Sequence, residues 1–197
     1  MSVIISVMSV AIVACSNDAD QAPSKTHSGN SSGLVLSVAG VGPINRDIPF
    51  NLKQINLAFR EYDLSVEEFK TFAEGNAYPI IRVSDQADLL MVINPDVSRE
   101  KIFSVMITDN RVGNVFGHTI GQKFGDIYRY GQTEECAAGA EELAGKVLCY
   151  APTSNNILYL FKGNWDGPSG KVPPNYVLSE WSLDAIIWKP QKKPTVK

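Results

Sequence analysis

Short runs of apolar residues, separated by polar and turn-forming residues, occupy most of the chain after residue 33. Gly, Pro, Asn or Asp bounds each run, and these residues end strands because they favour turns. Six runs are predicted as strands: 34–44, 89–93, 101–108, 146–150, 157–162 and 184–189. The run at 101–108 is apolar on both faces, so we expect it near the centre of a sheet.

Helical spacing is found in only two places. Leu52, Ile55 and Phe59 stand at i, i+3 and i+7, which predicts an amphipathic helix over 51–61, with its first residue, an Asn, as N-cap. Residues 123–130 place three apolar side chains on one side and are predicted as a short helix or a turn.

The segment 66–74 allows two interpretations. Its composition suits a short helix over 65–74, but Gly75 and Asn76 follow it and lead into the strand-like run 78–83. We favour a β-hairpin with its turn at 74–76, because a Gly-containing turn between two such runs is a hairpin signal. The short helix is the alternative.

These elements predict an α+β fold: a mainly antiparallel sheet with two or three short helices packed on it. The two halves of the chain echo each other, since each passes from a strand end that contains Gly through a short helix into consecutive strands. A duplicated helix-plus-meander unit would explain this echo. Two polar, Gly-rich segments, 109–122 and 163–174, are predicted as long loops.

The first fifteen residues differ from all that follows. Residues 1–14 carry no charge and end in Ile12, Val13 and Ala14, directly before Cys15. An apolar segment of about 7–15 residues that ends in small residues is typical of an export signal, and it is too short to span a bilayer. We interpret it as a lipoprotein signal peptide, with Cys15 as the lipid-bearing first residue of the mature protein. The basic residues usual at the start of a signal are missing, and the alternative is an ordinary apolar element with a chance cysteine.

The remaining boundaries follow from composition. Residues 15–33 are rich in Ser, Asn, Asp and Gly and are predicted as a flexible tether, in which His27 has no assigned role. Residues 34–190 form one globular domain, and 191–197 a disordered tail. Because Ser16 and not Asp follows Cys15, we expect the lipid anchor in the outer membrane, on its periplasmic side.

Charge and cysteines narrow the class of protein. A net charge of −3 at pH 7 gives no electrostatic footprint for nucleic acid. Cys136 and Cys149 are left after Cys15, and in an oxidising compartment we expect a disulfide between them rather than two buried thiols. The disulfide would close the loop between residues 136 and 149, and closing a loop of this length contributes roughly 3 kcal/mol to the free energy of unfolding in the chain-entropy picture. With His27 and His118 the only histidines, no metal site is predicted.

No motif of a known catalytic class is present, so we expect no cofactor and no enzyme activity. His118 has no identifiable Asp, Ser or Cys partner and is interpreted as a loop residue, with an unrecognised hydrolase as the weaker hypothesis. The acidic pairs Glu67–Glu68, Glu134–Glu135 and Glu141–Glu142 are interpreted as solvated surface, because adjacent strand residues point to opposite faces.

The most distinctive local feature is the loop around Trp165. Trp165, Asp166, Gly167 and Pro168 stand between two further glycines at 163 and 170. A Trp in such a loop can be a platform for a ligand, or it can close one end of the core, which we favour. Trp181 and Trp188 are expected in the core.

Several of these segments together resemble a known family, the RpoE-regulated, YfeY-like lipoproteins of Gram-negative bacteria, whose function is unknown. The matching segments are Gly40-Val41-Gly42, Met91-Val92-Ile93-Asn94-x-Asp96, Gly121-x-x-Phe124-x-Asp126-x-Tyr128, Cys136, Cys149, Gly163-x-Trp165-x-Gly167-Pro168-x-Gly170 and Ile186-Ile187-Trp188. The resemblance spans about 40–189 and includes Cys15. The sequence departs from the family pattern in three features: it lacks basic residues at the start of the signal, its tether is rich in Asp and Ser, and its tail is rich in Lys.

The resemblance implies an envelope lipoprotein under extracytoplasmic stress control, and it supplies no catalytic residues. We therefore expect a non-catalytic interaction or envelope-maintenance module. It would be attached to the membrane by the lipid on Cys15 and would contact an envelope protein partner. The alternative is a periplasmic binder of a small ligand or glycan that uses the Trp165 loop.

Overall fold

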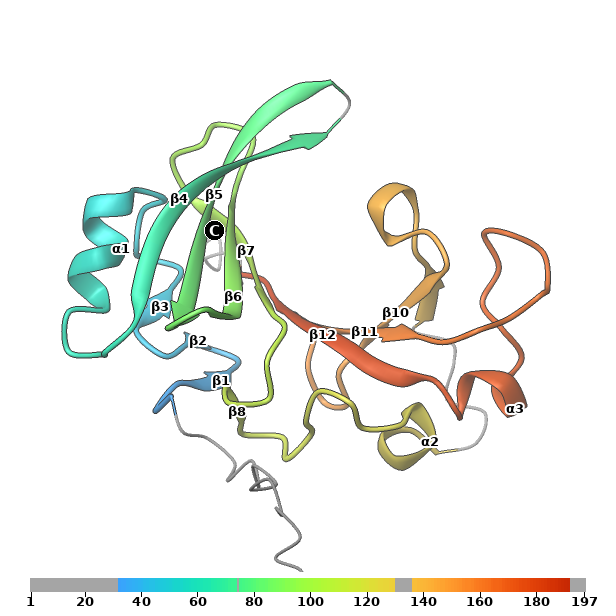
Figure 1. Ribbon diagram of the computed structural model, residues 1–197. Helices are drawn as coiled ribbons and strands as arrows, with labels where there is room; N and C mark the ends of the chain where they lie inside the picture. The colour runs from blue at the N-terminus through green and yellow to red at the C-terminus, as the bar shows by residue number, and fades with distance from the viewer. Residues whose placement is uncertain (1–31, 74, 130–135, 192–197) are drawn as a thin grey trace, which may run out of the picture.

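An eight-stranded antiparallel sheet forms the centre of the molecule (Figure 1). The structure is a computed structural model that describes residues 32–73, 75–129 and 136–191. The strands lie in the order β4-β5-β6-β7-β12-β11-β10-β9. Their bounds are β4 Ser65–Ala73, β5 Asn76–Asp85, β6 Asp88–Pro95, β7 Ile102–Ile107, β9 Cys136–Ala138, β10 Lys146–Tyr150, β11 Ile157–Lys162 and β12 Ser182–Trp188. The predicted mainly antiparallel α+β fold is confirmed.

The sheet consists of two four-stranded meanders, β4–β7 and β9–β12, which meet where β7 pairs with β12. Only three residue pairs join them: Ile107 with Ile186, Met106 with Ile187 and Val105 with Trp188. The ribbons of the two meanders diverge from this junction (Figure 1). The strand order is symmetric about the junction, and whether it records a duplicated unit stays a prediction.

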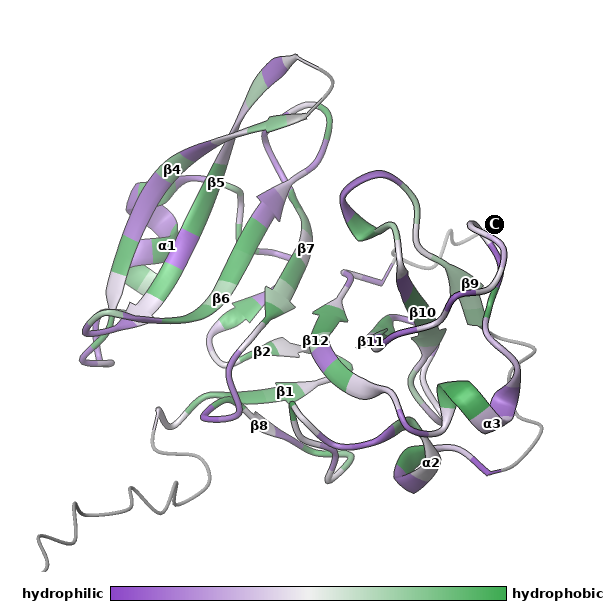
Figure 2. Cartoon of the chain, turned by 45° about the vertical axis from the view of Figure 1, so that its right-hand side comes forward, coloured by the Kyte–Doolittle hydropathy of each residue, from purple (hydrophilic) through white to green (hydrophobic). Residues whose placement is uncertain are grey.

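A second, smaller sheet lies at the base of the β7–β12 junction (Figures 1 and 2). It has the order β3-β2-β1-β8, with β1 Val35–Ser37, β2 Gly40–Val41, β3 Ile44–Asn45 and β8 Gly113–Asn114. The prediction of one strand over 34–44 was therefore wrong. Gly42 has φ +54°, and a Cβ on Gly40 would lie 2.0 Å from the Ile44 carbonyl oxygen, so the chain turns back sharply here.

The predicted first helix is confirmed as α1, Leu52–Ala58. The Asn51 side chain accepts a hydrogen bond from the Gln54 backbone N–H at 3.2 Å, which caps the first turn. Ile55 and Phe59 are buried against the sheet. The described residues form three shorter helical turns: α2 Phe124–Ile127, a 3-10 turn η1 at Glu141–Leu143 and α3 Asn175–Leu178. α2 was predicted as a short helix or a turn, whereas η1 and α3 were not predicted.

The segment after α1 is a hairpin, as favoured from the sequence, and the helical alternative over 65–74 was wrong. β4 and β5 pair along their whole length, from Ser65 with Ser84 to Ala73 with Asn76. Gly75 has φ +77°, a conformation that glycine adopts without a steric penalty.

The main core lies between one face of the large sheet and the elements packed on it, namely the small sheet, α1 and α2. Trp188 and Trp181 are 1% and 5% exposed, so the prediction that both are core residues is confirmed. Beside the second meander, Phe124 of α2 stacks on Tyr128 at 4.5 Å between ring centroids, and Phe161 of β11 meets Phe124 edge-on at 5.1 Å.

Polar contacts fix the small sheet to both meanders. Its β1–β2 turn lies against the second meander, where the Val38 carbonyl accepts hydrogen bonds from Asn156 Nδ2 at 2.9 Å and Trp188 Nε1 at 3.1 Å. On the side of the first meander, Arg111 binds both carboxylate oxygens of Asp109 at 2.9 Å and Asp85 at 3.0 Å. Ser32 Oγ donates to the Arg111 carbonyl at 2.7 Å.

Several predictions concern residues outside the described ranges. These are the signal peptide, the lipid-bearing Cys15, nearly all of the tether, the pair Glu134–Glu135 and the tail beyond residue 191. In the part of the chain that the structure does describe, no helix has the length and apolar character needed to cross a bilayer.

Candidate functional site

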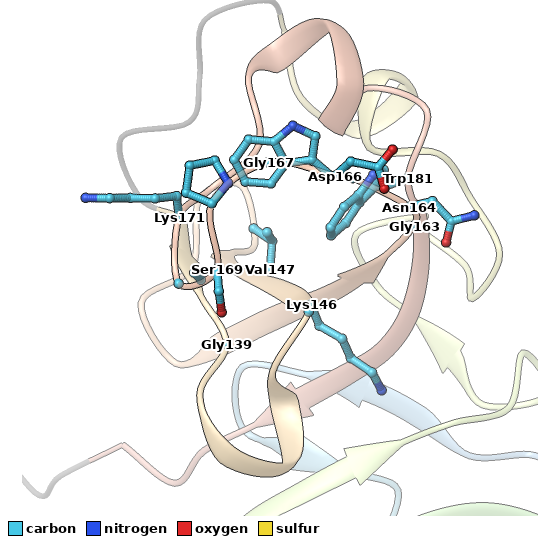
Figure 3. A pocket seen from close by; sticks show the side chains of 15 residues that line it. Gly139, Lys146, Val147, Gly163, Asn164, Asp166, Gly167, Ser169, Lys171 and Trp181 are labelled. Atoms are coloured by element: carbon cyan, nitrogen blue, oxygen red, sulfur yellow. The ribbon is translucent and has the colours of Figure 1, made fainter.

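The loop around Trp165 borders a pocket of about 300 Å³ (Figure 3). Residues 163–171, which follow β11, form one side of it. The other side is formed by residues 138–139 at the end of β9 and 145–147 at the start of β10. The sequence marked only the first side, because nothing in the local pattern shows that the β9–β10 connection folds against a loop about 20 residues further on.

Two indole rings support this loop from within. A Cβ on Gly163 would lie 2.2 Å from Cδ1 of Trp181, and a Cβ on Gly167 would lie 2.0 Å from Cζ2 of Trp165. Each ring therefore packs directly on backbone that only glycine allows. Trp165 is half-buried and packs against the main core, which favours its structural role, although it also lines the pocket.

The polar side chains of the pocket do not converge on one point. Asn164 and Asp166 extend at one end of the loop, and Lys171 extends away from it at the other (Figure 3). Lys146 extends toward the sheet, where its Nζ lies 2.7 Å from Asp184. Much of the lining is backbone of glycines, so the pocket offers N–H and C=O groups and indole surface rather than a charged centre.

The Trp181 indole N–H is buried and has no hydrogen-bond partner among the described residues. It lies directly under Gly163, since a Cβ there would be 2.4 Å from Nε1. An unsatisfied buried donor has a free-energy cost of about 1–3 kcal/mol. Among the described residues that line the pocket, it is the buried side-chain donor that has no partner.

The disulfide lies beside this pocket. Cys136 in β9 and Cys149 in β10 are directly opposite in the antiparallel register, and their sulfurs are bonded at 2.05 Å. The bridge that the sequence predicted is thus present in the structure. It ties the three-residue edge strand β9 to the sheet, and with it the wall of the pocket at Ala138 and Gly139.

Below the pocket, Asp184 accepts from Lys146 and from Lys162, so one carboxylate of β12 links two neighbouring strands. Burial by itself would raise the pKa of Asp184. The hydrogen bonds from Lys146 and Lys162 outweigh that effect and hold the pKa below its usual range. The carboxylate of Asp184 and the two lysines together carry one net positive charge. The carboxylate therefore cross-links strands and is not available as a free acid.

His118 is not part of the pocket lining and lies in the segment that follows β8. Its Nδ1 is 2.8 Å from the hydroxyl of Tyr159, which is buried, and Asn114 Nδ2 donates to the same hydroxyl at 3.2 Å. A neutral imidazole with an unprotonated Nδ1 can accept the Tyr159 proton in this arrangement, while the hydroxyl oxygen accepts from Asn114; the donor and acceptor roles of the ring follow its tautomer. Burial lowers the pKa of His118, which agrees with that form.

The other sequence candidates for chemistry are not brought together. Glu67 and Glu68 are exposed neighbours on β4, and Glu141 and Glu142 are exposed on η1. Within the described ranges, no group of three or more His, Cys, Asp or Glu residues has a geometry that could hold a metal ion.

Comparison with known proteins agrees with the fold. A family described as "Protein of unknown function (DUF1131)" matches residues 19–190. The uncharacterized protein YfeY of Escherichia coli K12 is 30% identical over 160 residues, which are 80% of this chain and 81% of that protein. The crystal structure of YfeY from Escherichia coli matches with a TM-score of 0.65 at 28% identity, over 78% of this chain and 98% of that one. The chain therefore belongs to the DUF1131 family, whose function is unknown.

Proposed function

We propose that this protein is a lipoprotein of the bacterial envelope that acts by binding and not by catalysis. Cys15 would carry the lipid and hold the domain on the periplasmic side of the outer membrane. The domain would serve as an interaction or maintenance module for an envelope protein partner. The resemblance to stress-regulated lipoproteins further suggests that its expression follows the extracytoplasmic stress response.

The observation that carries this proposal is the bridge between Cys136 and Cys149, together with the signal-like sequence that ends at Cys15. Structural disulfides persist in the periplasm and are rare in the cytosol. One lipid-modified cysteine and one bridge would account for all three cysteines of the chain. Two or more acyl chains suffice for stable anchoring, because each buried CH₂ contributes about 0.8 kcal/mol.

Metabolic labelling with an alkyne fatty acid tests the anchor. The full-length chain should take up the label and appear in the outer-membrane fraction, and Cys15→Ser should abolish both results. Cys136→Ser is the matched control, since it removes a cysteine that should never be acylated. A chain with the mass of the unprocessed, unlabelled polypeptide in the cytosolic fraction would contradict the proposal.

Cross-linking of intact envelopes tests the interaction role. The lipidated wild type should yield a reproducible cross-linked protein partner, which is lost when the domain is displaced to the periplasm by Cys15→Ser. Recovery of bulk lipid alone would count against an interaction module.

A second candidate function is binding of a small ligand or glycan at the Trp165 pocket. The specific observation in its favour is the concave pocket between residues 163–171 and 145–147, with the Trp181 N–H unpaired in its wall among the described residues. Titration of the tryptophan fluorescence with envelope glycans and lipids should then give a saturable change. Trp165→Phe should weaken this change while leaving the fold intact. A signal that none of these ligands alters would remove this candidate.

A further inference from the structure

The outer edge of the large sheet is formed by β4, the longer of its two edge strands. β4 has nine residues, whereas the other edge strand, β9, has three and is tied down by the disulfide. The β4–β5 hairpin projects from the body of the molecule (Figure 1). Long exposed edges present unpaired backbone groups to other strands, so proteins usually cover or block them.

The pairing of β4 with β5 shows which backbone groups face outward. Ala73 and Asn76 close a two-residue turn, so they form a hydrogen-bonded pair, and the odd-numbered residues of β4 bond to β5. The even-numbered residues therefore direct their N–H and C=O groups away from the sheet. Asn56 of α1 agrees with this assignment, because its Nδ2 donates to the Val66 carbonyl at 3.4 Å.

α1 thus covers the edge at Val66 and leaves the rest open. Among the described residues, no hydrogen bond to the outward backbone groups of Glu68, Lys70 or Phe72 is present. Phe69 and Phe72 are 38% and 71% exposed, although phenylalanine side chains are usually buried. The open edge carries two apolar rings and three charged residues, of which Glu68 and Lys70 stand at positions whose backbone groups point outward.

We propose that this edge pairs with the same edge of a second copy of the chain, in an antiparallel register centred on Phe69 and limited to residues 67–71, since α1 covers the edge at Val66. In this register Glu68 stands opposite Lys70 of the second copy, and Lys70 stands opposite its Glu68. Each of these two pairs would exchange two backbone hydrogen bonds. The two Phe69 rings would meet at the centre, on the face where Arg82 already lies 4.4 Å from the ring centroid in each copy.

The charges select this register over its neighbours. A shift by two residues in one direction would put Lys70 opposite Lys70, and in the other direction Glu68 opposite Glu68. Like charges directly opposite each other destabilise antiparallel pairs, whereas opposite charges stabilise them. A shift by one residue would set outward-pointing groups against groups already bonded to β5. The edge is therefore self-complementary in one register, which identifies a second copy as the occupant.

Cysteine cross-linking of the full-length protein in cells tests the register. Phe69→Cys places two thiols directly opposite each other at a non-hydrogen-bonded position, where Cα atoms are about 4.5 Å apart and a disulfide fits. The chain's own bridge joins directly opposed strand residues in the same way, with a Cα–Cα distance of 4.1 Å. Oxidation should give a dimer on a non-reducing gel. The matched control Thr71→Cys lies on the same face but opposite Glu67, and it should give only background.

Exchanging the charges of Glu68 and Lys70 distinguishes specific pairing of the two edges from cross-linking by random collision. In the Phe69→Cys background, Lys70→Glu and Glu68→Lys should each reduce the dimer yield roughly tenfold. The double exchange Glu68→Lys with Lys70→Glu should restore it, because the opposite charges face each other again. These side chains are exposed, so the fold should tolerate all three variants, and the thermal unfolding temperature of each confirms this.

Three outcomes would overturn the proposal. The first is equal cross-linking by the Phe69→Cys and Thr71→Cys variants. The second is a single charge reversal without effect, or a double exchange that does not restore the dimer. The third is a disulfide from the Phe69→Cys variant to a different protein, which would mean that the edge receives a foreign strand. The result does not depend on lipidation, so failure here would leave the proposed envelope function standing.

Discussion

At the scale of single residues, the stability of the Trp165 loop depends on two positions that have no side chain. Gly163 and Gly167 let the indoles of Trp181 and Trp165 pack directly on the backbone. Neither glycine has a positive φ, so their role here is close approach and not an unusual backbone conformation.

Gly163→Ala is expected to lower the free energy of unfolding by about 1–3 kcal/mol, because the new methyl group would overlap the Trp181 ring. Urea unfolding measures the loss. In a Trp181→Leu background, which removes the ring, the same substitution should have a much smaller effect. A loss of equal size in both backgrounds would contradict direct packing.

His118 predicts a pH dependence of stability. Its pKa is lowered by burial, so the folded protein binds fewer protons at this site than the unfolded chain does between the lowered value and about 6.5. Stability from this residue is therefore present above about pH 6.5 and is lost as pH falls through the folded pKa. His118→Asn keeps an acceptor for Tyr159 and should flatten this part of the profile.

Urea midpoints of the wild type and His118→Asn between about pH 7.5 and 5 check this. The difference between the two proteins isolates the histidine from the carboxylates that titrate in both. If the two profiles stay parallel over this range, His118 is not held in its neutral form by the fold.

At the scale of elements, the disulfide holds the edge strand β9 and one wall of the pocket. Replacing both Cys136 and Cys149 by Ser should lower the free energy of unfolding by about 3 kcal/mol, as expected for a loop of roughly this length. Hydrogen exchange should rise first in β9 and in the backbone of 138–147. Protection that falls uniformly over the whole sheet would show that the bridge acts globally instead.

The local sequence pattern predicted those elements that short-range signals determine, such as apolar runs and turn residues. β10 and β11 were predicted with their observed bounds, and the glycine turn at 75 distinguished a hairpin from a helix. The small sheet could not be foreseen, because β1 pairs with β8 through Val35 and Gly113, far apart in the chain. α3 has four residues, too few for a periodic signal. For the site, sequence pointed to the Trp165 loop but not to the wall opposite it.

At the scale of the whole molecule, Asn156 connects parts that the sheets alone would leave loosely joined. Its Nδ2 donates to the carbonyls of Val38, in the β1–β2 turn, and of Lys189, after β12, at 2.9 and 3.0 Å. The side chain is 5% exposed, so water cannot easily replace it. The Asn156 amide therefore joins the small sheet to the second meander at this point, beside the Trp188 indole, which donates to the same Val38 carbonyl.

Asn156→Ala should lower the free energy of unfolding by about 1–3 kcal/mol, since it removes the buried donor of two hydrogen bonds, to the carbonyls of Val38 and Lys189. Thermal unfolding measures this. Asn155→Ala is the matched control, because Asn155 is exposed and should give a change within about 0.5 kcal/mol. Equal losses at the two positions would mean that the amide does not join the two parts.

The Ser32–Arg111 contact has a mechanical consequence if the protein is tethered to a membrane. Ser32 is the first residue that the structure describes; its hydroxyl donates to the Arg111 carbonyl, while the Arg111 guanidinium binds Asp85 at the end of β5. A force applied at Ser32 would thus act on both the small sheet and the large sheet, and would not separate β1 alone. In a pulling experiment, Arg111→Gln should let the small sheet detach at a lower force than the wild type.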